Sequence, residues 1–384
     1  MLIMKYILQS HLFRAIPENS PWAALLLIPV IIISGAYWTS IPFYLVIATL
    51  WLFHRKTSIP WESGIALMGS CLLAIFVVSK TDYAFWIYTI KIIGCFVIVV
   101  SLRPAINDQQ RFWIDTFFVF VLWIIWETNS YFQLDRWTFD FGNRYHPNWT
   151  AIYCFLFAML AVRWRLPLAL LTALILGWLT GSRNFTLALG IVGLSYLSLP
   201  IWHWVFSKTS RAVVVYLFFA GLSLWILEQI SHGNWSGIQL FEGREFSFKA
   251  DYARLDWNMI GIREWTKNMQ TFVWGMGDWP NGGPNPHHSL IHTLLERGLV
   301  CTALLIIFII NDLRKHARGM EPWLLGWFSL GMYLHLNFVT MFWVIAILIL
   351  RCRYIRNGVE VQEDAFVELI LLKWNALRSR KVTS

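Results

Sequence analysis

The sequence predicts an all-α, polytopic integral membrane protein, and three observations support that fold class. Hydrophobic residues make up 57% of the 384 residues, charged residues make up 14%, and the mean hydropathy is +0.54. An average soluble domain carries about 25% charged residues. Apolar runs long enough to cross a bilayer recur along the chain. Many of the 24 tryptophans lie at the ends of these runs, as in an interfacial aromatic belt.

Each apolar run is expected to form one transmembrane helix, giving about 12 helices in all. The chain then divides into transmembrane helices 1–9 (residues 1–229), a long outer loop (230–286), transmembrane helices 10–12 (287–353) and an amphipathic tail (354–384). The basic end and apolar stripe of the tail suit a membrane surface. The approximate helix centres are Pro29, Val46, Leu72, Ile93, Val119, Leu156, Ala173, Gly190, Phe219, Leu304, Ser329 and Ile345.

Loop charges predict that both termini are cytoplasmic. With the N-terminus inside, alternation places every strongly basic short loop inside, including "RWR" at 163–165 and "RKHAR" at 314–318. This distribution follows the positive-inside rule. The two longest polar segments, about 127–147 and 231–286, then lie outside. In a bacterium, the chain is a multi-pass protein of the inner membrane and those segments are periplasmic.

Two alternative classes are disfavoured by where the charges and thiols lie. The net charge of +9 comes mostly from short loops between apolar runs, which argues against a nucleic-acid partner. The five cysteines lie in or beside apolar runs and form no CxxC pair, which argues against a redox or zinc-binding role. We therefore interpret them as packing residues. They are Cys71, Cys95, Cys154, Cys301 and Cys352.

The segment "NGGPNPHHSLIHTLLERG", from Asn281 to Gly298, concentrates titratable side chains at an expected helix start. Asn285 is a good capping residue and Pro286 suits the first helical position. His287 and His288 would then lie in the first turn, where the helix dipole disfavours a protonated imidazole. A neutral histidine acts as a general base or as a hydrogen-bond partner.

The helix that follows carries further polar residues on one face. His288, His292 and Glu296 are spaced i, i+4, i+8 and should lie on the same side. One interpretation is that these residues only line the mouth of a span. A metal site is disfavoured, because the spacing is not that of an HExxH motif and no cysteine precedes it nearby.

Arginines near the outer ends of spans are candidate phosphate ligands, since a guanidinium group binds phosphate bidentately. Arg183, in "TGSRNFTLAL", lies at the outer junction of two spans; the alternative is snorkelling to lipid headgroups. Arg254 begins an amphipathic helical stretch in the long outer loop. Arg144, in "FGNRYHPNWTA", lies just outside another span, where Asn148 is expected to cap a helix. Lys91 lies within the fourth span, and the sequence does not identify its partner.

Taken together, these motifs resemble the O-antigen ligase and O-antigen polymerase family of bacterial envelope enzymes. "GSR" (181–183) opens a late span, and a long periplasmic loop follows with an arginine–tryptophan helix, Arg254 and Trp257. A "GMG" turn (275–277) comes next and leads into the histidine helix. The resemblance covers roughly residues 143–300, and the earlier spans match only in hydropathy.

The histidine helix looks like the family pattern H-N-x-x-L-x-x-x-x-E-x-G. Counted back from Glu296 and Gly298, the family histidine falls on His287, and His288 stands where an asparagine is usual. Aligning the motif on "HS" instead puts the role on His288, with one residue missing before the glutamate. Spacing favours His287, and both alternatives remain open.

The resemblance implies an all-helical fold like that of the C-type glycosyltransferases. Such enzymes move a glycan from undecaprenyl pyrophosphate to an acceptor hydroxyl at the periplasmic face, without a cofactor or required metal. Ligases use the lipid A–core as acceptor, in lipopolysaccharide biosynthesis, and polymerases use a second lipid-linked glycan. The implied residues are His287 and His288 (catalytic), Arg183 and Arg254 (pyrophosphate-binding), and Arg144, Glu296 and Ser182 (substrate-binding or supporting).

Other functions remain as alternatives. A transporter of lipid-linked sugars or solutes commonly shows paired repeats and broken helices at mid-membrane. The sequence shows no internal repeat, and its titratable residues crowd one face of the membrane. An intramembrane protease is disfavoured because no serine–histidine or paired-acid motif lies within the spans. Ligase is slightly preferred over polymerase by the order of motifs alone.

Overall fold

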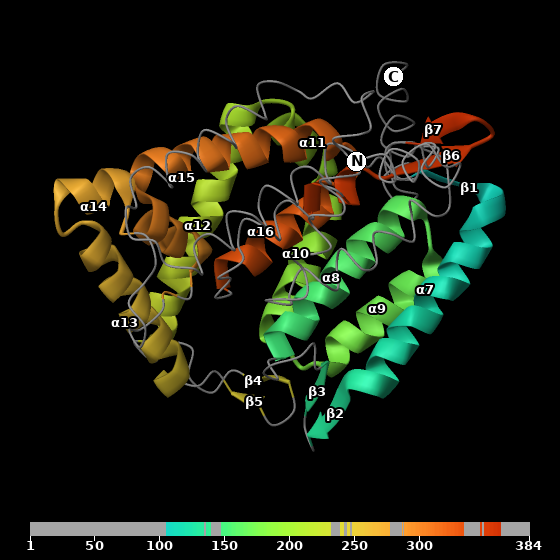
Figure 1. Ribbon diagram of the computed structural model, residues 1–384, viewed down its shortest axis with the longest axis horizontal. Coiled ribbons are helices and arrows are strands. Elements are labelled where there is room, and N and C mark those ends of the chain that lie inside the picture. The colour runs from blue at the N-terminus through green and yellow to red at the C-terminus, as the bar shows by residue number, and fades with distance from the viewer. Residues whose placement is uncertain are drawn as a thin grey trace, which may run out of the picture.

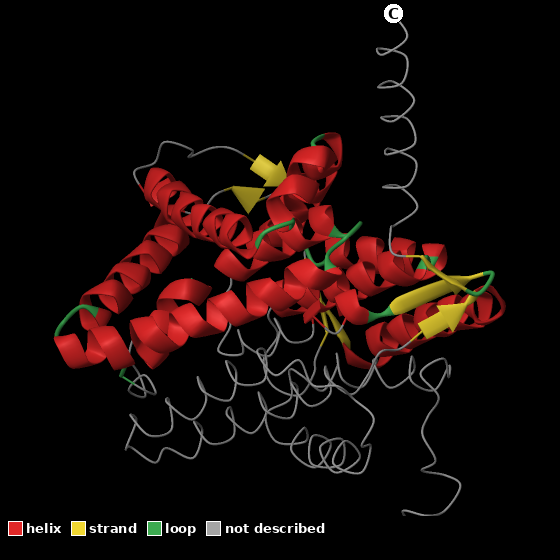
Figure 2. Cartoon of the chain, turned by 90° about the horizontal axis from the view of Figure 1, so that it is seen from above, coloured by secondary structure: helices red, strands yellow, loops and turns green. Residues whose placement is uncertain are grey.

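The computed structural model describes most of the chain from residue 105 to residue 361, and the described part is mostly helical (Figure 1). The helical part of the predicted fold class is therefore confirmed. Figure 2 shows from above that helices form the body of the molecule. The described residues are 105–133, 136–139, 147–231, 239–241, 244–245, 248–276, 286, 288–333, 346–347 and 349–361.

Several predicted spans correspond to helices in the structure. The expected centres Val119, Leu156, Ala173, Gly190, Phe219, Leu304 and Ser329 all fall within helices, and the remaining centres lie outside the described residues. The helices are α7 (Asp108–Asn129), α8 (Pro147–Trp164), α9 (Pro167–Leu179), α10 (Arg183–Leu197), α11 (Leu199–Phe206), α12 (Thr209–Ser231), α13 (Phe248–Trp265), α14 (Met269–Trp274), α15 (Ser289–His316) and α16 (Glu321–Tyr333).

Among the described helices, α12 and α15 are long and apolar enough to cross a membrane. The pair α10 and α11 adds a third candidate if it is counted as one span bent by 96°. Helices α8 and α9 are apolar but shorter. With 13 residues, α9 is about 20 Å long, less than the hydrocarbon core of about 30 Å.

Short strands join the helices, a feature that the all-α prediction missed. β1 (Ala105–Asn107) pairs in parallel with β6 (Arg353–Arg356), which pairs antiparallel with β7 (Val359–Val361). Two hairpins lie at the opposite end of the molecule from this sheet (Figure 1). They are β2 (Ser130–Gln133) with β3 (Arg136–Phe139), and β4 (Gln239–Phe241) with β5 (Arg244–Glu245). The start of the predicted tail is thus a strand pair, and its expected helix lies outside the described residues.

The core is centred on α8, whose residues 151–161 are all buried. Phe155 packs its ring against Trp327 of α16 and, edge to face, against Phe185 of α10. α10 runs along α16, and α8 runs along α9. Three of the predicted packing cysteines, Cys154, Cys301 and Cys352, are buried free thiols, which confirms their assignment; Cys71 and Cys95 lie outside the described residues.

The start of α9 is capped from a different helix. Leu166, at the cap position, makes no side-chain cap hydrogen bond. Instead, the buried Asp115 carboxylate of α7 accepts from the backbone N–H groups of Leu168 (3.1 Å) and Ala169 (2.7 Å). A carboxylate at a helix N-terminus satisfies free donors and favours the helix dipole, so Asp115 ties α7 to α9.

Basic segments that are far apart in sequence meet beside the three-stranded sheet. Arg163 Nε donates to Cys352 O at 2.7 Å, and Arg111 donates to the Tyr354 hydroxyl at 3.4 Å. The guanidinium of Arg165 lies 5.5 Å from the centre of the Tyr354 ring. Loops that the positive-inside rule assigns to one side of the membrane are therefore neighbours in the fold.

Candidate functional site

The histidine segment begins α15 in a different register from the one expected. The helix starts at Ser289, and the cap residue is His288, whose Nδ1 accepts from the Ile291 N–H at 3.5 Å. The prediction that Asn285 caps the helix and Pro286 occupies its first turn is therefore wrong. Pro286 is buried and packs against α13 instead, which moves the helix start three residues along the chain.

His288 is fully buried against α12. Its Nε2 lies 2.9 Å from Ser223 Oγ and 3.2 Å from Ala220 O, and Ser223 Oγ donates to the same carbonyl at 2.8 Å. Because Nδ1 accepts a hydrogen bond, the consistent tautomer carries its proton on Nε2 and donates it toward α12. Nε2 thus holds the start of α15 to α12, while Nδ1 caps α15 itself.

Burial also fixes the charge of this histidine. Loss of solvation lowers the pKa of His288 to about 4, against a smaller opposing effect of its hydrogen bond to Ala220. The sequence-based expectation of a neutral imidazole is confirmed for His288, with burial as the main cause. In this arrangement the neutral His288 ring, with both nitrogens hydrogen-bonded, caps α15.

The expected polar face of α15 is present. The His292 N–H donates to His288 O at 2.9 Å, and His292 Nε2 lies 3.5 Å from Glu296 Oε1. His292 is buried, whereas the Glu296 side chain is 28% exposed. The face therefore begins at a buried cap and ends at a carboxylate that solvent reaches.

A glycine pair joins this face to the glycine-rich turn. Gly298 breaks α15 with φ +69° and ψ 179°, and Gly275, after α14, has φ +85°. A Cβ on Gly298 would overlap Val273 O and Gly275 N, and a Cβ on Gly275 would overlap Glu296 O. Only glycine allows such an approach at these angles. The Met276 N–H donates to Leu295 O at 2.8 Å, which completes the contact.

Helix α13 packs against the start of α15 through a third glycine. A Cβ on Gly261 would lie 2.6 Å from Pro286 Cγ and 3.0 Å from Ile291 Cγ2. Arg254 was expected to begin the helix, but α13 starts six residues earlier, at Phe248. A spacing of three residues places Asn258 and Gly261 on one stripe of α13.

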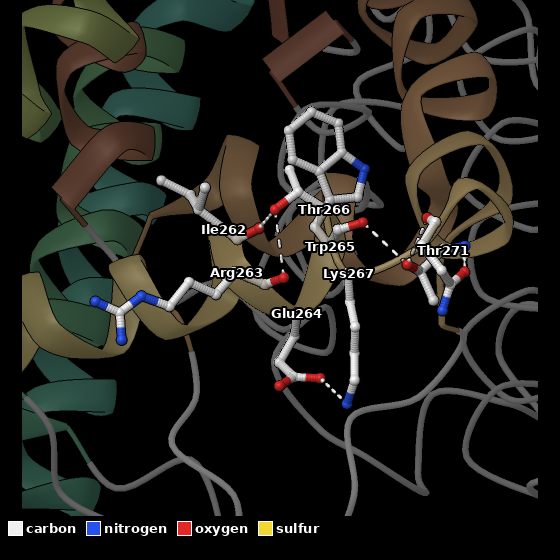
Figure 3. Close-up of polar contacts among 8 residues, drawn as sticks. Ile262, Arg263, Glu264, Trp265, Thr266, Lys267 and Thr271 are labelled. Carbon is white, nitrogen blue, oxygen red and sulfur yellow. Dashed lines mark hydrogen bonds and ion pairs between the residues drawn. The ribbon is translucent and has the colours of Figure 1, made fainter.

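The corner between α13 and α14 is held by local polar contacts (Figure 3). Thr271 Oγ1 donates to Trp265 O at 3.0 Å, and the Lys267 ammonium lies 3.3 Å from Glu264 Oε2. The Trp265 ring stacks on Phe272, with ring centroids 4.8 Å apart. The described part of the long outer segment is therefore built from packed helices.

Arg183 is the first residue of α10, after a tight turn from α9. The Thr180 hydroxyl donates to Gly177 O at 2.6 Å, and Gly181 has φ +58°. Ser182 occupies the cap position without a side-chain cap bond, and it is buried while Arg183 is half-buried. An arginine combined with a helix N-terminus favours an anion.

The structure brings some of the predicted residues together and leaves others apart. His288 caps α15 and Glu296 lies within it. The helix of Arg254 packs on α15 and α12, whereas α10 carries Arg183 beside α16 and α8. His287, Arg144 and Lys91 lie outside the described residues. Asn148 lies inside α8, which begins at Pro147, so it is not the cap.

Sequence reasoning missed two polar residues of this region. Ser223 of α12 contacts His288, and Asn258 of α13 is fully buried, with no hydrogen-bond partner for either amide atom among the described residues. Ser223 lies in a helix without a motif, and Asn258 is not one of the motif positions of the arginine–tryptophan helix, so only the packing identifies them. Within the described residues, no group of three or more His, Cys, Asp or Glu side chains is arranged to hold a metal ion.

No family model matches the chain, and neither a curated protein nor a solved structure matches it. The functional interpretation therefore depends on the geometry above and on the motif resemblance.

Proposed function

We propose that this chain is a membrane glycosyltransferase of the O-antigen ligase and polymerase type. It takes a glycan linked to undecaprenyl pyrophosphate and moves it to an acceptor hydroxyl at the periplasmic face, preferably on the lipid A–core. In this proposal, the chain crosses the bacterial inner membrane about 12 times, with both termini cytoplasmic. The meeting of Arg111, Arg163 and Arg165 near the three-stranded sheet supports that orientation.

The observation that carries the proposal is the packing of three motif segments into one unit. The Arg254 helix meets the start of α15 at Gly261, and the "GMG" turn meets the glutamate–glycine motif at Gly275 and Gly298. His288 fastens the same helix to α12. Segments spread over residues 248–300 thus form a single body at the start of a candidate span.

The chemistry of glycan transfer assigns distinct roles to the two histidines. The acceptor oxygen attacks the anomeric carbon, the bond from that carbon to the pyrophosphate oxygen breaks, and the lipid pyrophosphate leaves as an anion. We assign His287 to orienting the acceptor hydroxyl and taking its proton, an effect worth roughly 10²- to 10⁴-fold. His288 holds the helix in place, since both of its ring nitrogens are engaged.

The leaving group needs positive charge more than it needs a proton. Pyrophosphate departs readily when its charge is matched, and each charge-assisted hydrogen bond contributes about 1.5–3 kcal/mol. We assign Arg183, at the first turn of α10, and Arg254, on α13, to this task. Glu296, at the end of the polar face of α15, supports the glycine contact; Ser182 and Arg144 are assigned supporting roles.

The proposal is tested in a host that lacks its own O-antigen ligase but still makes the lipid-linked O-antigen. Expression of this chain should restore a lipopolysaccharide ladder on the lipid A–core. His287→Ala and Arg183→Ala should each abolish the ladder, whereas the matched control Lys267→Ala, at an exposed ion pair, should leave it unchanged. A well-expressed, membrane-inserted protein that yields no ladder contradicts the ligase assignment; longer lipid-linked chains would favour the polymerase.

A further inference from the structure

We infer that the corner between α11 and α12 binds the headgroup of an anionic phospholipid. This inference rests on the membrane placement in the proposed function and adds a lipid site on the face opposite the glycan chemistry. It concerns a cluster of Trp204, Lys208, Arg211, Arg314 and Lys315, named here the corner cluster.

The bend before α11 sets the geometry. α10 and α11 meet at 96°, so α11 runs along the membrane surface if α10 crosses the bilayer. α11 buries Leu199, Val205 and Phe206 against the protein and exposes Ile201 (58%) and Trp204 (61%). A short helix with one buried face and one exposed aromatic face suits the interface between headgroups and acyl chains.

Basic side chains converge where α11 meets α12. The Arg211 guanidinium lies 3.8 Å from the centre of the exposed Trp204 ring and donates to Ser207 Oγ at 2.6 Å. From α15, Arg314 donates to Thr209 Oγ1 at 2.6 Å and to Ser207 O at 3.2 Å. These bonds fix the two arginines at the corner.

The neighbouring lysines are exposed, and nearby acidic groups are engaged or buried. Lys208 and Lys315 are exposed and flank the fixed arginines in sequence. On the adjoining helices, Glu321 pairs with His203 at 2.9 Å, and Asp312 is buried. Within the described residues, no carboxylate forms an ion pair with the four basic side chains, so the corner cluster presents positive charge beside an exposed tryptophan.

Charge and apolar surface together select the ligand. A phosphate headgroup matches the cations, and its acyl chains match the exposed apolar side chains of the two preceding helices, including Ile201 on α11 and Leu194 (67% exposed) and Leu197 (84% exposed) on α10. An acidic polypeptide would match only the charges. Basic residues at the membrane surface attract anionic lipid, and here the bend adds the apolar half of the site.

Native mass spectrometry of the purified full chain tests this inference. Protein taken from nanodiscs of phosphatidylcholine with added phosphatidylglycerol should retain phosphatidylglycerol at the corner. Lys208→Gln with Lys315→Gln should weaken its retention about 25-fold, at roughly five-fold per cation. Lys267→Gln, a lysine in the α13–α14 corner, is the matched control and should retain as much lipid as the wild type.

Several outcomes would overturn the lipid site. They are equal retention of phosphatidylcholine and phosphatidylglycerol by the wild type, unchanged retention in the double variant, or binding of a polyglutamate peptide in place of lipid. Arg211→Lys keeps the positive charge of the corner cluster and should therefore retain as much lipid as the wild type. The assay contains no glycan, so failure of the transferase assignment leaves this result intact.

Discussion

Gly298→Ala tests the contact that unites the motif segments. At φ +69° and ψ 179° the backbone lies in a region that is essentially glycine-only, where another residue costs about 1–3 kcal/mol. The new methyl group would also overlap Val273 O and Gly275 N, which are backbone atoms that cannot rotate away. We therefore expect a loss of at least about 2 kcal/mol in the free energy of unfolding, together with loss of glycan transfer.

The assay is thermal unfolding of the detergent-purified protein, followed by tryptophan fluorescence. Gly190→Ala is the matched control, because it lies within α10 and its Cβ would meet no atom within 4 Å. That change should be neutral or stabilising by up to about 1 kcal/mol. The reasoning is refuted if Gly298→Ala unfolds at the same temperature as Gly190→Ala, since the glycine contact would then be absent from the protein.

Three further predictions concern buried polar groups. Asn258→Leu should raise the unfolding temperature, because it removes an unpartnered buried amide that costs about 1–3 kcal/mol; a lower temperature would show that the amide is satisfied. Asp115→Ala should destabilise by about 2–3 kcal/mol through the lost cap of α9, whereas Asp256→Ala, at an exposed position, should not. His288 has a folded pKa of about 4, below its unfolded value of about 6.5, so its unfolded form binds the proton first. The contribution of His288 to stability should therefore fall as pH drops from 6.5 to 4, by up to about 3 kcal/mol, and His288→Asn should remove that contribution.

The sequence predicted helical segments well where apolar runs were long. Leu156 and Phe219 fall well inside helices because a helix satisfies the backbone hydrogen bonds of a long apolar run within the run itself. The prediction of a helix start failed where a local sequence signal competed with tertiary packing. Asn285 and Pro286 form a good helix start, yet Pro286 packs on Gly261 and the helix begins at Ser289.

The candidate site was predictable in its motifs but not in its contacts. The histidine pair and the glycine turns are visible as residue types, whereas the meeting of Gly275 with Gly298 depends on the path of the chain between them. Ser223 and Asn258 carry no sequence signal, because a single polar residue in a helix is ordinary until its neighbours are known. The strand β6 could not be predicted from "RCRYIR", because its partner strand β1 lies far away in the chain.

The most direct test of the central assignment is transfer by the purified protein in nanodiscs. The substrates are undecaprenyl-pyrophosphate-linked O-antigen and lipid A–core. The wild type should form glycan-bearing lipid A–core and release undecaprenyl pyrophosphate in equal amounts, and His287→Ala should lower the rate at least 100-fold, at the low end of general-base effects. Folded protein that releases no pyrophosphate with either lipid A–core or a second lipid-linked glycan as acceptor would contradict the assignment.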